Sequence, residues 1–530
     1  MEGCQTFSWE QNAMQTNLHF TQKFAPAIVA SLDCYDRVIF KGHLPFGSDG
    51  HLNAFVDGVL RMRRKDFLPF VEQLSQDLVD GAKKTAADAQ APYEHYEYRC
   101  NKEAIVRRIL QERPQDDGLV AVLCCKETCR TVKLAHGQGR PRLYFAKRPQ
   151  RVLYFYFLDP QFGLMHVRIQ TWFPFTIQVY VNGHEWLARQ MLDARIGFVQ
   201  QDNAFTQLDD PQRAQQLADR FPRLRWVKLL DAFARRVTTP LRGVRWLRER
   251  AYYWVIDQAE YSTDLLFKNR AELAALFPRL VEHALLHFSA ADILTFLGRR
   301  LHPLFDGEVL TSCKKERIPG TRIKHRMKNN WLKMYDKFGL VLRVETVINQ
   351  PREFRVRRRR MRQGREQMVW CPMNKGVANF YHYREVAHAA NHRYLNALAV
   401  VDAPTATHRQ LDRLSEPAAF HDRRRRGLNL LRSQEQKLFR AVLQGDLCLH
   451  GIRNRDIADA LYGRAPKDLA ARRRRTVRVS RLLQLLRAHG LMAKIAHSHR
   501  YRVTDKGMTL MSAAVYARHK LLPKELDDAA

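Results

Sequence analysis

The chain has 530 residues, of which 89 are Lys or Arg and 54 are Asp or Glu, so its formal net charge at pH 7 is +35. Its 45% hydrophobic content excludes a mainly disordered chain, because that much apolar surface can form packed cores. The lack of a long apolar run and of a leader pattern in MEGCQTFSWEQ predicts a soluble, cytoplasmic protein without a membrane partner, and the length predicts about three domains.

Residues 1–204 are predicted to form an α+β domain that contains an antiparallel meander. Strand patterns occur in RVIFKG and LVAVLCC, and the meander comprises RVLYFYFL, LMHVRIQTW and TIQVYV. The turn sequence Asn182-Gly183 then leads into a helical pattern, HEWLARQMLDARIG.

Residues 205–310 are predicted to be a helical region. Stretches such as AELAALFPRLVEHALLHF and SAADILTFLGRRL carry apolar residues at the spacing that places them on one face of a helix.

Residues 311–401 are predicted to contain a β-hairpin, an Arg-rich loop and a helix. The strands NWLKMYDK and LVLRVETVI flank the tight turn Phe338-Gly339, and the helix follows at 383–401. We expect this segment to pack on the first domain. Residues 402–427 mix Pro, Thr, His and Arg without a clear period and are predicted to be a linker.

Residues 428–530 carry the clearest local pattern. SQEQKLFRAVLQG, NRDIADALYG and RRTVRVSRLLQLLRAHG predict three helices, and MAKIA and RYRVT predict two short strands before a closing helix. This order resembles the winged helix-turn-helix domain of MarR-like bacterial DNA-binding proteins.

The resemblance implies that the third helix enters the major groove of duplex DNA and that the wing contacts the adjacent backbone or minor groove. Carried over by position, the candidate contacts are Arg474, Arg475, Thr476, Arg478, Ser480, Arg481 and Gln484 in the helix, and His499, Arg500 and Arg502 in the wing. Winged helices also serve as protein-docking modules, which is the alternative. The chain as a whole also resembles large bacterial proteins, a likeness that implies no mechanism.

Clusters of Arg indicate a nucleic-acid partner. They comprise Arg357, Arg358, Arg359 and Arg360, then residues 423–426, and then Arg472, Arg473, Arg474 and Arg475. A run of like charges costs folding stability unless an anion neutralises it, and the phosphate backbone is an abundant cytoplasmic polyanion. Exposed charge runs also occur as simple solvated faces. We expect nucleic acid to be the partner, with duplex DNA favoured and RNA as the alternative.

The first hairpin strand carries Lys333, Tyr335, Asp336 and Lys337, and the second carries Glu345. This K-x-Y-D-K and R-x-E pattern resembles a hairpin in replication initiators of phages and rolling-circle plasmids. The resemblance implies a nucleophilic Tyr335 with Asp336 and Glu345 as metal carboxylates. The pair of histidines around one hydrophobic residue that is expected of such enzymes has no match. The alternative is a polar-faced hairpin without chemistry.

Two further arrangements are candidate metal sites. Asp36, next to RVIFKG, and Glu345 are carboxylates from separate strands, which is the arrangement that would hold Mg²⁺ or Mn²⁺ in a nuclease of RNase H type. Glu385, His388 and His392 share one face of a predicted helix and offer ligands for zinc or iron. Histidines on a basic helix also pack or contact phosphate, so no cofactor is firmly predicted.

The sequence therefore predicts a nucleic-acid-binding protein that binds duplex DNA through its C-terminal module and a second basic surface, in replication initiation or in a mobile element. The alternatives are a metal-dependent nuclease or strand transferase and an RNA-binding protein of a ribonucleoprotein. The sequence contains neither a GxxxxGK[ST] loop nor a GxGxxG fingerprint, which disfavours an ATP-driven helicase or a dinucleotide enzyme.

Overall fold

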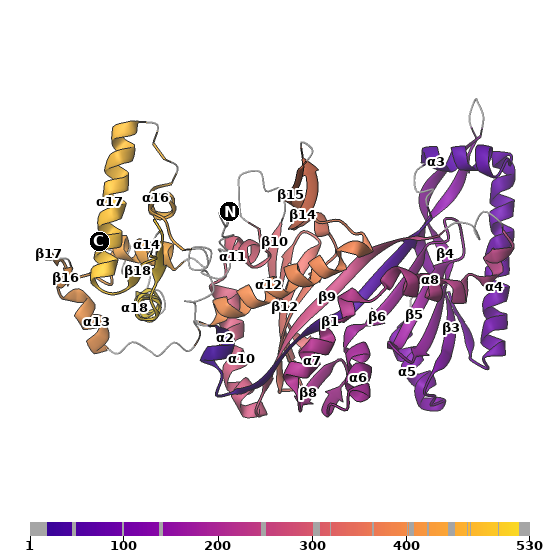
Figure 1. Ribbon diagram of the computed structural model, residues 1–530, viewed down its shortest axis with the longest axis horizontal. Helices are drawn as coiled ribbons and strands as arrows, with labels where there is room; N and C mark the ends of the chain where they lie inside the picture. The colour runs from indigo at the N-terminus through magenta and orange to yellow at the C-terminus, as the bar shows by residue number, and fades with distance from the viewer. Residues whose placement is uncertain are drawn as a thin grey trace, which may run out of the picture. The chain divides into compact units, whose positions relative to one another are not determined.

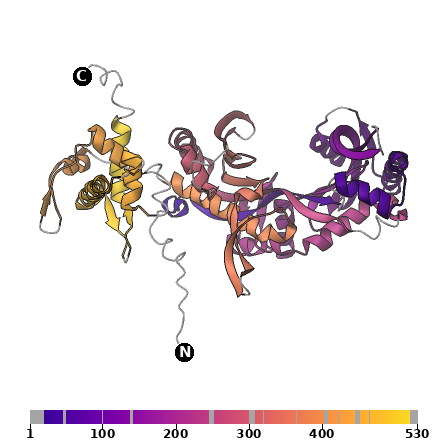
Figure 2. The same ribbon diagram turned by 90° about the horizontal axis from the view of Figure 1, so that it is seen from above.

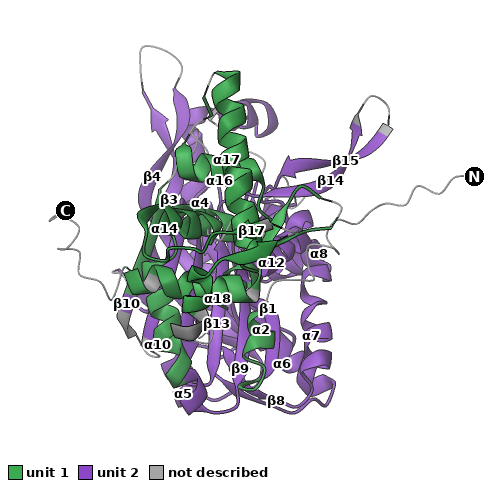
Figure 3. Ribbon diagram, turned by 90° about the vertical axis from the view of Figure 1, so that its left-hand side faces the viewer, with its two compact units in different colours: residues 1–28, 274–313, 392–530 green, residues 29–273, 314–391 purple. Residues whose placement is uncertain are grey.

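The chain forms two compact units (Figure 3). The larger comprises residues 29–273 and 314–391, and the smaller comprises residues 1–28, 274–313 and 392–530. The computed structural model describes residues 19–518 except 45–48, 98–99, 137–140, 245–250, 300–307, 318–319, 363–364, 400, 402–407, 421–422, 444–450, 464, 467 and 497. Within these ranges no helix has the length and apolar character needed to span a membrane.

The fold is α+β, as predicted, and is organised around an 11-stranded sheet in the order β10-β11-β12-β13-β9-β1-β6-β5-β4-β3-β2 (Figure 1). The strands are β1 (Ile28–His43), β2 (Tyr93–Tyr96), β3 (Gly118–Ala135), β4 (Arg142–Asp159), β5 (Gly163–Gln170), β6 (Ile177–Asn182), β9 (Tyr253–Phe267), β10 (Val309–Arg317), β11 (Gly320–Met327), β12 (Asn330–Lys337) and β13 (Val341–Ile348). The pairs from β3 to β6 are antiparallel, which confirms the predicted meander, and β2 runs parallel to β3.

Helices and two small hairpins connect or follow these strands along the chain. The helices are α3 (Asp49–Ala54), α4 (Phe67–Asp88), α5 (Lys102–Glu112), α6 (Gly183–Asp193), α7 (Pro211–Ala218), α8 (Trp226–Val237), α10 (Arg270–Leu286), α11 (Ala290–Phe296) and α12 (Phe380–Leu398). The hairpins are β7 (Phe198–Gln201) with β8 (Ala204–Leu208) and β14 (Arg355–Arg362) with β15 (Arg365–Pro372). Aromatic packing fixes α8 and α12 to the sheet, because the ring of Phe40 lies 4.7 Å from Trp226 and 5.4 Å from Phe380.

The predicted boundary at residue 204 lies inside the larger unit, which is a correction to the domain assignment. The described part of residues 205–310 forms the helices α7, α8, α10 and α11 as expected, but this region also supplies β9, which occupies the sheet between β13 and β1. The prediction missed β9 because its buried side chains include Glu260 and Asp264, so its sequence lacks the apolar alternation of a strand. The predicted hairpin, now β12–β13, joins the same sheet through β9, so it continues the first domain's sheet directly.

The C-terminal part of the smaller unit has its own core. It contains α13 (His408–Ser415), β16 (Ala418–Phe420), β17 (Arg423–Arg425), α14 (Ser433–Val442), α16 (Asn454–Tyr462), α17 (Leu469–Ala488), β18 (Met492–Lys494), β19 (Tyr501–Val503) and α18 (Asp505–Tyr516). Phe439, Ile457, Val479 and Leu486 are buried together in this core. The predicted linker is partly structured, because Leu414 packs in the same core.

Candidate metal centre on the central sheet

Polar side chains from neighbouring strands meet on one face of the sheet. Glu345 of β13 lies opposite Lys333 of β12 and Ser262 of β9, and Arg343 lies opposite Asp264. Directly opposed residues of antiparallel strands point to the same side of the sheet. Every second residue along one strand also points to that side. The strand register therefore places Arg343 and Glu345 together with the polar residues of β9.

Three carboxylates form the centre of this face. One oxygen atom each of Asp36, Glu260 and Glu345 can be chosen so that all lie within 4.8 Å of one another. The side chains are buried, with relative exposures of 5% for Asp36, 5% for Glu260 and 1% for Glu345. Carboxylate oxygens are the ligands that Mg²⁺ and Mn²⁺ prefer, so we call Asp36, Glu260 and Glu345 the carboxylate cluster.

Burial and their charged neighbours shift the pKa values of Glu260 and Glu345 in opposite directions. Burial and the charge of Glu345 raise the pKa of Glu260 to about 8. Burial would also raise the pKa of Glu345, but Lys333 and the hydrogen bond from Glu260 lower it to about 2. The Nζ atom of Lys333 lies 2.7 Å from Oε1 of Glu345. At neutral pH Glu260 is therefore protonated beside an ionised Glu345. A divalent cation that binds both carboxylates would displace this proton.

Arg343 fixes the position of Asp36. Its guanidinium is fully buried and donates to both oxygens of Asp264, with Nε at 2.6 Å from Oδ1 and Nη2 at 2.5 Å from Oδ2. Its Nη1 lies 3.5 Å from Oδ2 of Asp36. Burial alone would raise the pKa of Asp36, but His184, Arg343 and Asn203 hold it well below its usual value. Asp36 therefore stays ionised inside the protein.

His184 connects Arg343 to Asp36. Nη2 of Arg343 lies 2.9 Å from Nε2 of His184, and Nδ1 lies 3.4 Å from Oδ1 of Asp36. Burial and Arg343 would lower the pKa of His184, but Cys34, Asp264 and Asp36 raise it well above its usual value. His184 is fully buried, so it orients the carboxylate without reaching solvent.

The first turn of α6 holds His184 against β1. The side chain of Asn182 caps the helix by accepting from the backbone N–H of His184 at 2.8 Å, and its amide donates to Asp36 at 3.3 Å. Gly183 allows the close approach, since a Cβ atom there would lie 2.1 Å from the carbonyl oxygen of Tyr35.

We expect Gly183→Ala to destabilise the protein by about 1–3 kcal/mol or more, because the backbone of β1 cannot move away without disturbing the sheet. Urea-induced unfolding monitored by circular dichroism measures the change. Gly58→Ala is the matched control, since a Cβ atom at Gly58 would meet nothing within 4 Å. Equal stability of the two variants would contradict the close packing of α6 on β1.

Basic side chains flank the carboxylate cluster on the same face. Arg322, Lys324 and Arg326 alternate along β11, and Lys324 lies opposite Lys333. Burial, together with the positive charges of Lys333, Arg322 and Arg326, lowers the pKa of Lys324. Nζ of Lys324 also lies 3.9 Å from the ring centre of Trp331. A phosphate group on this face would relieve the repulsion among these cations.

The sequence-predicted catalytic residues separate into two groups. The structure brings Asp36, Glu345 and Tyr335 together, and the hydroxyl of Tyr335 donates to Glu345 at 2.6 Å. Asp336 lies at the β12–β13 turn, where its carboxylate accepts from the backbone N–H of Gly339 at 2.9 Å. Burial and the charge of Glu345 raise the pKa of Tyr335 well above its usual value, which disfavours a phenolate nucleophile.

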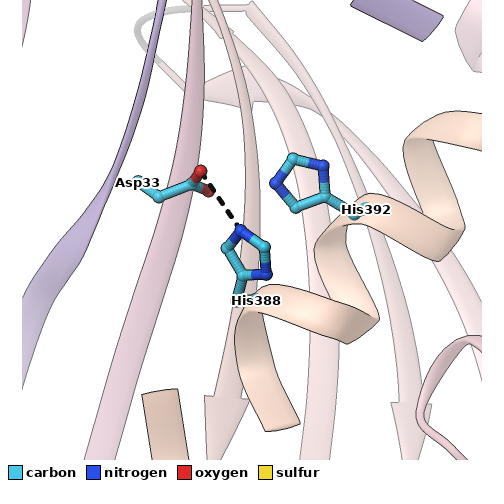
Figure 4. Close-up of side chains that lie close together, drawn as sticks. All are labelled: Asp33, His388 and His392. Atoms are coloured by element: carbon cyan, nitrogen blue, oxygen red, sulfur yellow. Dashed lines mark ion pairs between the residues drawn. The ribbon is translucent and has the colours of Figure 1, made fainter. Parts of the chain in front are cut away.

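A second group of metal-ligating side chains lies at β1 and α12. Nε2 of His388 lies 3.5 Å from Oδ2 of Asp33, and His392 follows one turn later on the same helix (Figure 4). One ligand atom each of Asp33, His388 and His392 lies within 4.8 Å of the others. Glu385, the third predicted ligand, instead lies 2.8 Å from Nδ1 of His382, so Asp33 stands in the place expected for it.

The predicted nucleic-acid contacts of α17 differ in their availability. Arg472, Arg473, Arg474, Arg478 and Arg481 are exposed. Of these, Arg474 lies 3.9 Å from Asp468. The other predicted contacts on this helix have partners within the module: Arg475 donates to Asp459 and to the carbonyl of Gly463, Thr476 donates to the carbonyl of Arg472, Ser480 accepts from Asn454, and Gln484 accepts from Arg425.

The remaining predicted contacts lie on two hairpins. In the wing, His499 is exposed, whereas Arg500 and Arg502 are partly buried. On β14, Arg357, Arg359 and Arg360 are exposed, and Arg358 is partly buried. The Arg-rich stretch was predicted as a loop, but it forms a strand. It pairs with β15, where Arg357 lies opposite Trp370 and Arg359 lies opposite Met368.

The sequence analysis missed Glu260 because this residue lies in the region predicted to be helical.

Comparison of the chain with protein-family models, with curated proteins and with solved structures finds no match. The function of the protein is therefore inferred from its own residues and geometry.

Proposed function

We propose that the protein is a metal-dependent enzyme that acts on the phosphodiester bonds of nucleic acid. The observation that carries this proposal is the buried carboxylate cluster of Asp36, Glu260 and Glu345, in which Nζ of Lys333 lies 2.7 Å from Glu345 and the pKa of Glu260 is raised. Buried carboxylates are costly to keep together unless a cation neutralises them. Their oxygen-only ligand set favours Mg²⁺ or Mn²⁺.

The chain's own residues support this chemistry. Ionised Asp36 and Glu345 would hold the cation, and Glu260 would join them after losing its proton. A bound divalent cation activates water and stabilises negative charge on a phosphoryl group. The cations Arg322, Lys324 and Arg326 on β11, which β12 separates from β13, would bind the phosphates on either side of the reacting one.

The direct test is to incubate the full-length protein with end-labelled single-stranded DNA, duplex DNA and RNA, with Mg²⁺, Mn²⁺ or EDTA. We expect cleavage or strand transfer of at least one substrate that requires the divalent cation. No change in any substrate with either cation would contradict the enzymatic proposal, and the substrate that reacts distinguishes DNA from RNA.

For the C-terminal module we propose a winged helix that binds duplex DNA. The order α14, α16, α17, β18 and β19 supports this assignment, and an isolated bridge between Ile452 and Tyr501 adds a third strand segment beside β19. The exposed Arg residues of α17 suit phosphate contacts and guanine recognition in the major groove. An enzyme with such a module would act at selected sites, as replication initiation or a mobile element requires.

We expect the triple variant Arg474→Ala, Arg478→Ala and Arg481→Ala to bind duplex DNA more weakly and with a shallower salt dependence. Each lost phosphate contact lowers the slope of log K against log salt by about 0.9. Fluorescence anisotropy at several salt concentrations measures this slope. The control replaces Lys437 and Arg440, exposed cations of α14, and should change it less. An unchanged slope in the α17 variant would assign duplex binding to another surface.

A further inference from the structure

The β14–β15 hairpin carries an uncovered face that combines arginines with large apolar side chains. It is a separate two-stranded sheet that projects from its unit (Figures 2 and 3). Its register pairs Arg357 with Trp370 and Arg359 with Met368. Cross-strand partners point to the same side, so these four side chains, together with Met361 at the next alternate position, share one face.

The apolar side chains on this face are exposed to an unusual degree. The relative exposures are 69% for Met361, 51% for Met368 and 55% for Trp370. A row of large apolar side chains on a projecting hairpin costs solvation free energy and marks a surface that binds something. The opposite face carries Arg358 and Arg360, whose cross-strand partners are Val369 and Gln367.

The charge of the hairpin identifies the class of ligand. β14 has the sequence RVRRRRMR, and β15 contributes a single acidic side chain, Glu366, whose Oε2 lies 3.8 Å from Arg359. Both groups of that ion pair are mostly exposed, so the pair leaves the arginine accessible. A strongly cationic hairpin is complementary to a phosphate backbone.

We propose that this face of the β14–β15 hairpin binds single-stranded nucleic acid, with unpaired bases stacked on Trp370 and the two methionines and with phosphates bound by Arg357 and Arg359. Aromatic side chains beside arginines form the stacking platforms of single-strand-binding proteins. In a duplex the faces of the bases are stacked on one another, so Trp370 could not stack on them, whereas the bases of an unpaired strand are available. The inference rests on the proposed action on nucleic acid and specifies an unpaired strand as a ligand.

The test measures binding of a fluorescent oligothymidine and of a duplex of equal length to the full-length protein in EDTA, so that the metal centre does not contribute. We expect Trp370→Ala to weaken single-strand binding roughly 5- to 150-fold, the effect of losing one base stack, and Trp370→Phe to weaken it less. Duplex binding should change little. Circular dichroism confirms that each variant is folded.

Neighbouring arginines provide the matched control. Arg359→Ala and Arg360→Ala remove the same charge from opposite faces of one strand, so Arg359→Ala should reduce single-strand affinity more. Equal effects of these two variants, an unchanged affinity in Trp370→Ala, an equal loss on duplex DNA or the absence of single-strand binding by the unaltered protein would each overturn the proposal. Cleavage assays report separately on the carboxylate cluster: single-strand binding without cleavage would contradict only the enzymatic proposal.

Discussion

Replacement of Glu345 by Gln is expected to reduce divalent-cation-dependent cleavage by about 10²-fold or more. Glu345 is the ionised member of the Glu260–Glu345 pair and lies beside Lys333 and Tyr335, so its loss removes a cation ligand and leaves Lys333 without its nearest carboxylate. An amide oxygen is a neutral and much weaker ligand for a hard cation. Single-turnover cleavage of the preferred labelled substrate measures the rate.

Asp336→Asn is the matched control for this variant. Asp336 lies on the neighbouring strand, and Asn retains the oxygen that accepts from Gly339 at the turn. Its activity should therefore stay within a few-fold of that of the unaltered protein. Thermal unfolding must show that Glu345→Gln is folded. A folded Glu345→Gln protein with full activity would contradict the assignment of the cluster, and a severe loss in Asp336→Asn alone would move the catalytic role to the turn.

Cation affinity is expected to rise by as much as about tenfold per pH unit up to pH 8 and to level off above it. The pKa of Glu260 is raised to about 8, so a cation that uses this side chain must displace a proton below that pH. Calorimetric titration with Mn²⁺ in buffers of different ionisation enthalpy measures the released proton directly. We expect about one proton at pH 7 and none above pH 9. No proton release at pH 7 would contradict the raised pKa of Glu260.

The raised pKa of Glu260 also predicts how the free energy of unfolding of the cation-free protein depends on pH. The folded pKa of Glu260 lies above its unfolded value, so between about pH 5 and pH 8 the folded state binds one more proton than the unfolded state. The stabilisation that comes from protonated Glu260 is fully present below the pKa of this side chain in the unfolded state, and it is lost as the pH rises to 8. The free energy of unfolding should therefore fall with pH more steeply in the unaltered protein than in Glu260→Gln. Parallel curves would contradict this coupling.

Local patterns were sufficient for several parts of the fold. The hairpin strands β12 and β13 and the helices α14 and α16 follow the predicted positions, because apolar periodicity and the tight turn at Phe338-Gly339 are encoded within short segments. The position of β9 was not predictable in this way. Its inward side chains Glu260 and Asp264 are polar and match polar partners on other strands, which removes the local signature of a buried strand.

The candidate site was likewise predictable only in part from local sequence. Asp36, Tyr335 and Glu345 were each recognisable as residues of the right chemistry, but their proximity depends on strand pairing between segments far apart in the chain. Contacts within the fold also changed the role of other candidates: Glu385 pairs with His382 on its own helix, and Arg475 of α17 pairs with Asp459 of α16. Such contacts occupy groups that a linear pattern treats as available.

By itself the sequence determined the net charge, the α+β class, the meander and the order of elements in the C-terminal module, because these depend on composition and on interactions between near neighbours. Only the tertiary structure decided that Glu260 joins Asp36 and Glu345 and that the pKa of Glu260 is raised. Burial and the distance between carboxylates control their pKa values, and both arise when β9 pairs with β13 and lies beside β1.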